Sequence, residues 1–90
     1  MDIFDTEIFL DGFQFTEGLR WHRNNLWFCD LGDNAVYCFS ATGQLIKKIS
    51  VNTPVGLGWL SDNSLLITAL KKENYCNIKI IFYLFLNHLR

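Results

Sequence analysis

Glu17 is the residue whose type and position best fit a role in site chemistry. It directly precedes Gly18 in the stretch FTEGLRWHRNNLWFCD, which spans residues 15–30. A carboxylate at such a place can hold calcium or magnesium, because these hard cations prefer oxygen ligands. A lone acid at the start of a strand can equally be a solvated surface residue. Its meaning therefore depends on the elements around it.

A second stretch, VGLGWLSDNSLLITAL at residues 55–70, repeats the first. Gly18 recurs as Gly56, 38 residues later, and each glycine is followed by a leucine, a tryptophan, a polar turn and an apolar strand. Val55 stands where the first copy has Glu17, so only the first copy carries the carboxylate. Short strands that repeat at this period are typical of β-propeller blades.

Length and composition indicate one small domain with few possible classes of partner. The 90 residues carry a net charge of −1, and 50% of them are hydrophobic. No basic face is available for nucleic acid. The acidic start has no basic region of a secretory signal. The apolar run at residues 80–86 is shorter than the roughly 20 residues that a membrane-spanning helix needs. We therefore expect no nucleic-acid partner and no membrane partner.

The cysteines favour a reducing compartment. Their number is odd, and they form no CxxC motif that would indicate a metal site. Cys29 and Cys38 could face each other on adjacent strands, and Cys76 lies further along the chain. Free thiols in a cytoplasmic protein are the simplest interpretation.

Alternation and turn residues predict a series of short antiparallel strands, with no helical periodicity. Asn24 and Asn25 mark a hairpin, since Asn tolerates the left-handed conformation of a tight turn. The strand at residues 26–30 is apolar throughout, so it should be covered on both faces. An edge strand is expected at residues 7–13. In a closed propeller it would pair with a strand from a later part of the chain. The other predicted strands span residues 15–22, 35–39, 44–51, 55–60 and 64–70.

The tail at residues 73–90 differs from residues 1–72 in its composition and in its pattern of polar and apolar residues. It shows no turn signal and no alternation, and Lys, Asn, Ile, Tyr and Phe dominate it. These residues have codons rich in A and T, as expected when such DNA is read out of frame. One hypothesis is that the reading frame is lost near Lys72. The alternative is a native terminal strand used for self-association, in keeping with its aggregation-prone composition.

The segments EGLRWHRNNLWFCDLGDNAVYCFSATGQL and PVGLGWLSDNSLLIT resemble the opening of the senescence marker protein/gluconolactonase/luciferin-regenerating enzyme family. The nearest resemblance is to its bacterial lactonase-like members. The resemblance covers about residues 8–70 and departs from the family at Leu19, where Pro is usual. It implies an all-β fold, a fragment of a six-bladed β-propeller with about one and a half blades of antiparallel four-stranded meander.

The resemblance also implies a function. Family members are hydrolases of sugar lactones that use a divalent metal, calcium first and magnesium or zinc as alternatives. Glu17 matches the family's first metal ligand. The other ligands and the catalytic base lie in later blades, so no catalytic residue is assigned here. A small-molecule lactone would be the partner of the full-length enzyme, and this fragment is expected to bind no metal by itself.

We therefore expect a truncated relative of a gluconolactone-type hydrolase that is inactive alone. Two alternatives stay open: a non-catalytic propeller used for binding or scaffolding, and a β protein that self-associates through exposed strand edges. The remaining site-like residues are expected to be structural. Asp30 would cap a turn, His22 would pack in its strand, and Trp21, Trp27 and Trp59 would pack the blades.

Overall fold

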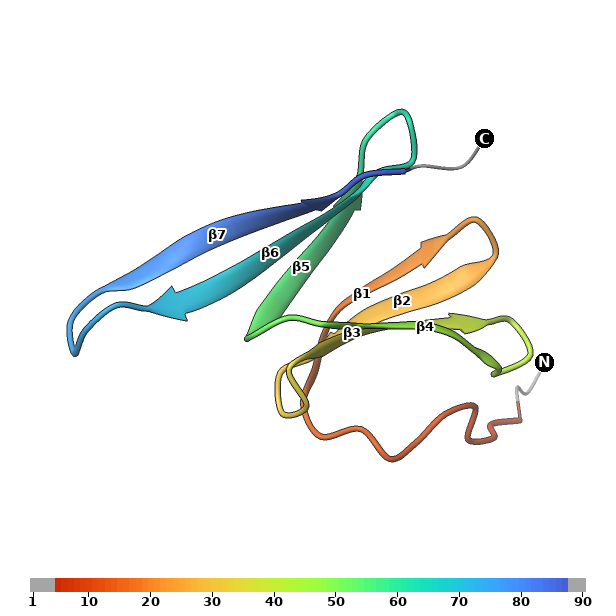
Figure 1. Ribbon diagram of the computed structural model, residues 1–90. Coiled ribbons are helices and arrows are strands. Elements are labelled where there is room, and N and C mark those ends of the chain that lie inside the picture. Colours follow the sequence, from red (N-terminus) through yellow and green to blue (C-terminus); the bar gives the residue numbers. More distant parts are fainter. Residues whose placement is uncertain (1–4, 88–90) are drawn as a thin grey trace, which may run out of the picture.

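The computed structural model describes residues 5–87, which form seven strands in two antiparallel sheets (Figure 1). Sheet A has the order β1-β2-β3-β4, and sheet B has the order β5-β6-β7. The described residues include no helix of the length and apolarity needed to cross a membrane. The strands are β1 (Thr16–His22), β2 (Asn25–Asp30), β3 (Ala35–Ser40), β4 (Leu45–Ser50), β5 (Pro54–Trp59), β6 (Leu65–Lys72) and β7 (Ile78–Phe85).

The all-β prediction is confirmed, and β1 to β6 lie within two residues of their expected positions. The first hairpin turn lies one residue earlier than expected. Arg23 and Asn24, with φ of 49° and 64°, form the two-residue turn, and Asn25 already belongs to β2. A two-residue turn with positive φ at both positions matches the twist of the flanking strands.

The edge strand predicted at residues 7–13 is wrong. Residues 5–13 form no strand, and the chain turns at Gly12, whose φ is 92°. The segment instead crosses one face of sheet A. The ring of Phe13 lies edge-on to those of Phe28, Tyr37 and Phe39 at centroid distances of 4.8, 5.1 and 5.7 Å. Side-chain contacts with a sheet face hold this segment, in place of a hydrogen-bonded edge.

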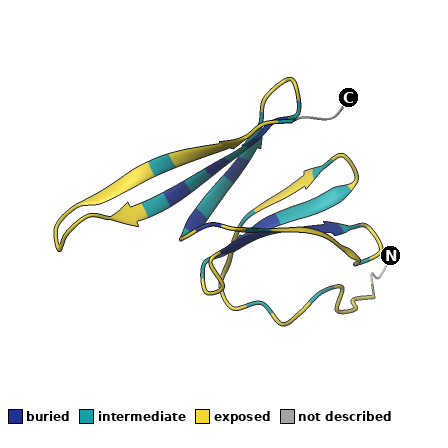
Figure 2. Ribbon diagram, viewed as in Figure 1, coloured by how far each residue is buried: buried dark blue, intermediate teal, exposed yellow. Residues whose placement is uncertain are grey.

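The core lies between the two sheets. We call the face that each sheet turns toward the other its inner face, and the opposite face its outer face. β2 is covered on both sides as predicted, by sheet B on the inner face and by Phe13 of the N-terminal segment on the outer face. Figure 2 shows the strand as intermediate in its first half and buried in its second. The buried core residues are Cys29, Val36, Val51, Leu57, Leu65, Ile67 and Ala69, with Trp27, Ile49 and Trp59 packed against them.

The internal repeat is visible in the pairing of the strands. Trp21 in sheet A and Trp59 in sheet B each pair with a leucine of the next strand. The residues of the strands that follow are also paired in equivalent positions in the two sheets. The sequence comparison missed that the repeat extends to β3 and β7, which place a Tyr-x-Phe element in the same register. The matching pairs are Trp21–Leu26, Leu26–Phe39 and Phe28–Tyr37 in sheet A, and Trp59–Leu65, Leu65–Phe85 and Ile67–Tyr83 in sheet B.

The tail contains a turn that the sequence analysis did not find. The side-chain Oδ1 of Asn74 accepts hydrogen bonds from the backbone N–H groups of Cys76 and Asn77, at 2.9 and 3.0 Å. The N–H of Glu73 donates to the carbonyl of Asn77 and closes the loop. Asn is a common turn residue for this reason. β6, this loop and β7 make a long hairpin that projects beyond sheet A (Figure 1).

Candidate functional site

Glu17 lies near the start of β1, at an irregularity in its pairing with β2. Its Cα is paired with that of Cys29, and the next pair joins Arg20 to Trp27, so a β-bulge separates the two. Gly18 lies in the bulge with a φ of 65°, a conformation that glycine adopts readily. Glu17 itself is exposed. The bulge therefore sets the local direction of the chain at the candidate metal ligand.

The bulge also brings β1 close to β5. A Cβ atom at Gly18 would lie 3.2 Å from the carbonyl oxygen of Val55 and 3.4 Å from the Cα of Gly56. The backbones of β1 and β5 therefore approach each other closely at Gly18. Glu17 lies beside the point where the first strands of the two sheets meet, with Val55, its counterpart in the repeat, across that contact.

Replacing Gly18 by alanine is expected to lower the free energy of unfolding by about 2 kcal/mol. The alanine would have to keep the left-handed backbone conformation, and its Cβ would press against backbone atoms of β5. Gly58 is the matched control, since nothing lies within 4 Å of its Cβ position. The Gly58→Ala variant should change stability by less than about 0.5 kcal/mol. Urea denaturation followed by tryptophan fluorescence measures both. Equal effects of the two variants would contradict the steric argument.

Glu17 acts electrostatically on the buried thiol of Cys29. Burial raises the pKa of Cys29 to about 11, and the charge of Glu17 adds to this, while Arg20 works in the opposite direction. The thiol is therefore protonated at neutral pH and is neither a nucleophile nor a metal ligand. Among the described cysteines no disulfide forms, and Cys29 and Cys38 share a face of sheet A without pairing directly.

Glu17 borders an open groove of about 840 Å³ between β1, β2 and the N-terminal segment. Asp11 also lines this groove, and most of the other lining side chains are apolar. Within residues 5–87, no three His, Cys, Asp or Glu residues are grouped so that they could hold a metal ion. The apolar lining side chains are Ile8, Phe9, Leu10, Phe13, Leu19, Leu26 and Phe28.

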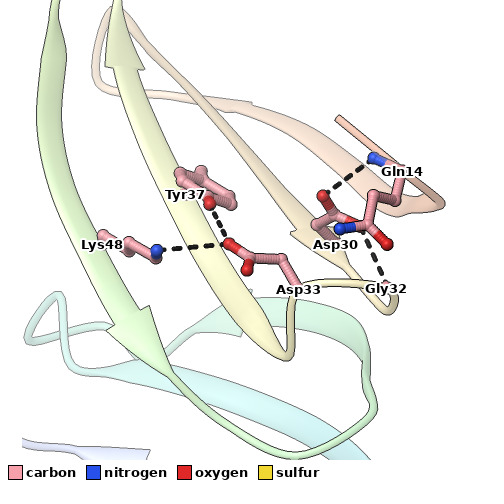
Figure 3. A network of polar contacts seen from close by, with 6 residues as sticks. All are labelled: Gln14, Asp30, Gly32, Asp33, Tyr37 and Lys48. Atoms are coloured by element: carbon pink, nitrogen blue, oxygen red, sulfur yellow. Dashed lines mark hydrogen bonds and ion pairs between the residues drawn. The ribbon is translucent and has the colours of Figure 1, made fainter. Parts of the chain in front are cut away.

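Asp30 anchors the N-terminal segment to sheet A (Figure 3). Its buried carboxylate accepts hydrogen bonds from the backbone N–H groups of Gln14 at 3.1 Å, Phe15 at 2.9 Å and Gly32 at 3.1 Å. Burial acts to raise the pKa of Asp30, but these N–H groups outweigh it and lower the pKa. Asp30 therefore has a structural role, as expected, although it holds a long-range segment in addition to its own turn.

A second polar network joins Asp33, Tyr37 and Lys48 on the surface of sheet A (Figure 3). The Asp33 carboxylate accepts a hydrogen bond from the Tyr37 hydroxyl and lies 3.2 Å from the Lys48 Nζ. The hydrogen bond from Tyr37, followed by that from Lys48, lowers the pKa of Asp33, and Asp33 raises the pKa of both partners. This network ties the β2–β3 turn to β3 and β4, and it forms no nucleophile.

His22 packs as expected, and Trp21 does not. The His22 ring stacks on Trp59 at 3.9 Å, and its Nε2 lies 2.6 Å from the Oδ1 of Asn63. The rings of Trp27 and Trp59 meet edge to face at 5.5 Å against the core. Trp21 is 60% exposed, so within residues 5–87 it does not pack the blades as expected. It lies on the outer face of sheet A, where the described residues supply no neighbouring sheet.

No protein-family model matches the chain, and comparisons with curated proteins and with solved structures give no match either.

Proposed function

We propose that this chain is one part of a propeller-type, metal-dependent sugar-lactone hydrolase, to which it contributes Glu17 as a ligand of a divalent cation. In this proposal the chain does not hydrolyse a lactone by itself. The proposal joins the family resemblance of the sequence to the place that Glu17 takes in the fold.

The position of Glu17 is the observation that carries the proposal. Glu17 is exposed beside the bulge at Gly18, where β1 of sheet A meets β5 of sheet B. If further sheets continue the series, their first strands also meet along this line, and side chains at equivalent places converge on one axis. An exposed carboxylate at that axis suits calcium or magnesium.

The described residues do not form a complete cation site. Calcium takes about six to eight oxygen ligands, and Glu17 provides two at most. A bound metal of this type would polarise a lactone carbonyl and lower the pKa of a coordinated water. We assign no catalytic step to the residues of this chain, and the proposed role of Glu17 is confined to holding the cation.

The isolated chain with added calcium is expected to hydrolyse gluconolactone no faster than buffer. The Glu17→Gln variant should behave identically, because one carboxylate cannot assemble the site. A continuous assay of acid release measures the rate, with Glu7→Gln as a control at another exposed acid. Calcium-dependent hydrolysis that is lost only in Glu17→Gln would show that the chain completes a site by itself.

The assignment to a lactonase is tested by the nucleotide sequence that encodes residues 66–90 and continues beyond them, read in all three frames. Further strand repeats with Asn and Asp residues at the places of Glu17 and Val55 would support it. If no frame contains them, the lactonase assignment is removed from this chain.

A further inference from the structure

The two sheets bury one face each in their contact and leave the other face of each sheet outside it. By the internal repeat, these two outer faces are equivalent to the two faces that the contact buries. In the repeat, the inner face of sheet A corresponds to the outer face of sheet B. Likewise, the inner face of sheet B corresponds to the outer face of sheet A. Both correspondences follow from the pairing registers, because paired residues on antiparallel strands point to one side of a sheet.

The outer face of sheet B is a repeat of a buried face. Phe82 and Leu84 of β7 take the register positions that Val36 and Cys38 have in β3. Val36 and Cys38 are fully buried on the inner face of sheet A, where Val36 packs with residues of sheet B, whereas Phe82 and Leu84 are 63% and 46% exposed. Ile80 continues the same apolar row, and Figure 2 shows most of β7 as exposed.

The outer face of sheet A repeats the other half of the contact. Leu57 of β5 is buried against sheet A, and Leu19, its counterpart in β1, is 62% exposed. Trp59 is half-buried, and its counterpart Trp21 is 60% exposed. Through Phe13, the N-terminal segment covers β3 and also Phe28 of β2 on this face, and it leaves the β1 side open.

We propose that copies of this chain associate head to tail, with the outer face of β6 and β7 in one copy packed on the outer face of β1 and on the groove beside it in the next. The new contact would continue the sheet A–sheet B interface, because it joins the same two kinds of face. This proposal does not depend on the lactonase proposal, since it uses neither Glu17 nor a metal.

The repeat also specifies which side chains meet. Within the chain, Val36 lies in one buried cluster with Leu57, Leu65 and Ile67. The corresponding residues are Phe82 on one side and Leu19, Leu26 and Phe28 on the other. These last three line the groove of about 840 Å³ beside the N-terminal segment. Phe82 of the second copy is therefore placed in this apolar groove.

Such a contact is heterologous, because it joins two different surfaces. Each added copy presents a fresh outer face of sheet B, so association continues until a ring closes or a fibre grows. Self-association by edge pairing of β7 with β7 differs in this respect, since it uses one surface twice and stops at a dimer.

The test uses one variant for each face. Trp21→Glu blocks the outer face of sheet A, and Phe82→Glu blocks the outer face of sheet B. Both side chains are mostly exposed in the single chain, so its fold does not depend on them. Leu19→Glu and Ile80→Glu are second choices for the same faces if either variant fails to fold. Tyr75→Glu, in the exposed loop of the long hairpin, is the matched control.

Light scattering coupled to size exclusion should give a mass above that of one chain for the unmodified protein and for Tyr75→Glu. Each face variant alone should run at the mass of one chain. A 1:1 mixture of Trp21→Glu and Phe82→Glu should give twice that mass and no more, because one intact face remains on each partner. Near-ultraviolet circular dichroism confirms folding through the Trp27–Trp59 contact.

Several results would overturn the proposal. An unmodified chain that stays monomeric at all concentrations would do so. Association that survives in Trp21→Glu would point to edge pairing of β7 and exclude the head-to-tail contact. Association that survives in Phe82→Glu would exclude the assigned face of sheet B. A mixture of the two folded variants that remains at the mass of one chain would show that the faces are not complementary.

Discussion

Replacing Ile67 by alanine is expected to lower the free energy of unfolding by about 3 to 4 kcal/mol, because the change leaves a cavity in the core. Ile67 is fully buried and belongs to the one cluster that joins sheet A to sheet B. Domains of this size are stabilised by only about 5–15 kcal/mol in total. A loss of this size should therefore remove most of the folded population under mild urea.

Ile46 provides the matched control for this substitution. It lies in β4 and is about half exposed, so Ile46→Ala removes the same atoms from a site that water already reaches. Its effect should be below about 1 kcal/mol. Urea titration of both variants at low protein concentration, followed by tryptophan fluorescence, gives the comparison. Similar midpoints for the two would mean that the sheets do not share a common core.

Replacing Asp30 by alanine is expected to lower the free energy of unfolding by about 3 kcal/mol, because three backbone N–H groups lose a buried, charged acceptor. These N–H groups belong to Gln14, Phe15 and Gly32. The N-terminal segment should detach together with this loss. Limited proteolysis within residues 5–13 measures the detachment, and urea denaturation measures the stability. Asp11→Ala changes an exposed carboxylate in the same segment and should leave both readouts nearly unchanged.

The contribution of Asp30 should also depend on pH. Its pKa in the folded chain is lowered, so its stabilising effect is complete above the unfolded-state pKa of about 3.9. The effect is lost as the pH falls through the folded-state pKa. The difference in stability between the unmodified chain and Asp30→Ala should therefore be constant near neutrality and shrink below about pH 4. A difference that persists at lower pH would contradict the ionic origin of the effect.

Local signals in the sequence were sufficient to place β1 to β6. The strands alternate or are apolar throughout, and the turns between them hold residues such as Asn24 and Asn34, which take positive φ. The internal repeat could also be found, because Gly18 and Gly56 are each followed by the same pattern. These features act over a few residues, so they can be recognised without knowing what packs on what.

Contacts between distant segments could not be predicted in this way. Asp30 accepts N–H groups from residues 14 and 15, and no sequence pattern connects them. The N-terminal segment was expected to pair along an edge because its apolar residues suit a strand, but Phe13 instead anchors it to a sheet face. Trp21 was expected to pack the blades, as Trp27 and Trp59 were, but the described residues supply no sheet on its side of sheet A.

The Tyr-x-Phe element of the tail was not recognised as part of the repeat, because the spacing of the repeat changes there. Phe28 and Tyr37, which pair in sheet A, are 9 residues apart, whereas Ile67 and Tyr83, which pair at the same place in sheet B, are 16 apart. The longer hairpin hides the shared Tyr-x-Phe element from a search at one fixed period.

The candidate site was predictable only as far as one residue. Glu17 could be singled out by its place before a repeated glycine, and the fold adds that β1 and β5 meet beside it. Under the proposed function the other oxygen ligands would come from further sheets, because residues 5–87 hold no group of side chains that could bind a metal ion.

The rate at which the two thiols on the inner face of sheet A react with a thiol reagent measures how often the two sheets separate. Cys29 and Cys38 are fully buried, and burial raises the pKa of both, so a thiol reagent reaches them only while the sheets are apart. Cys76, in the exposed hairpin loop, reacts without any such opening. The lag between the first thiol and the other two therefore reports how often the interface opens in the native chain.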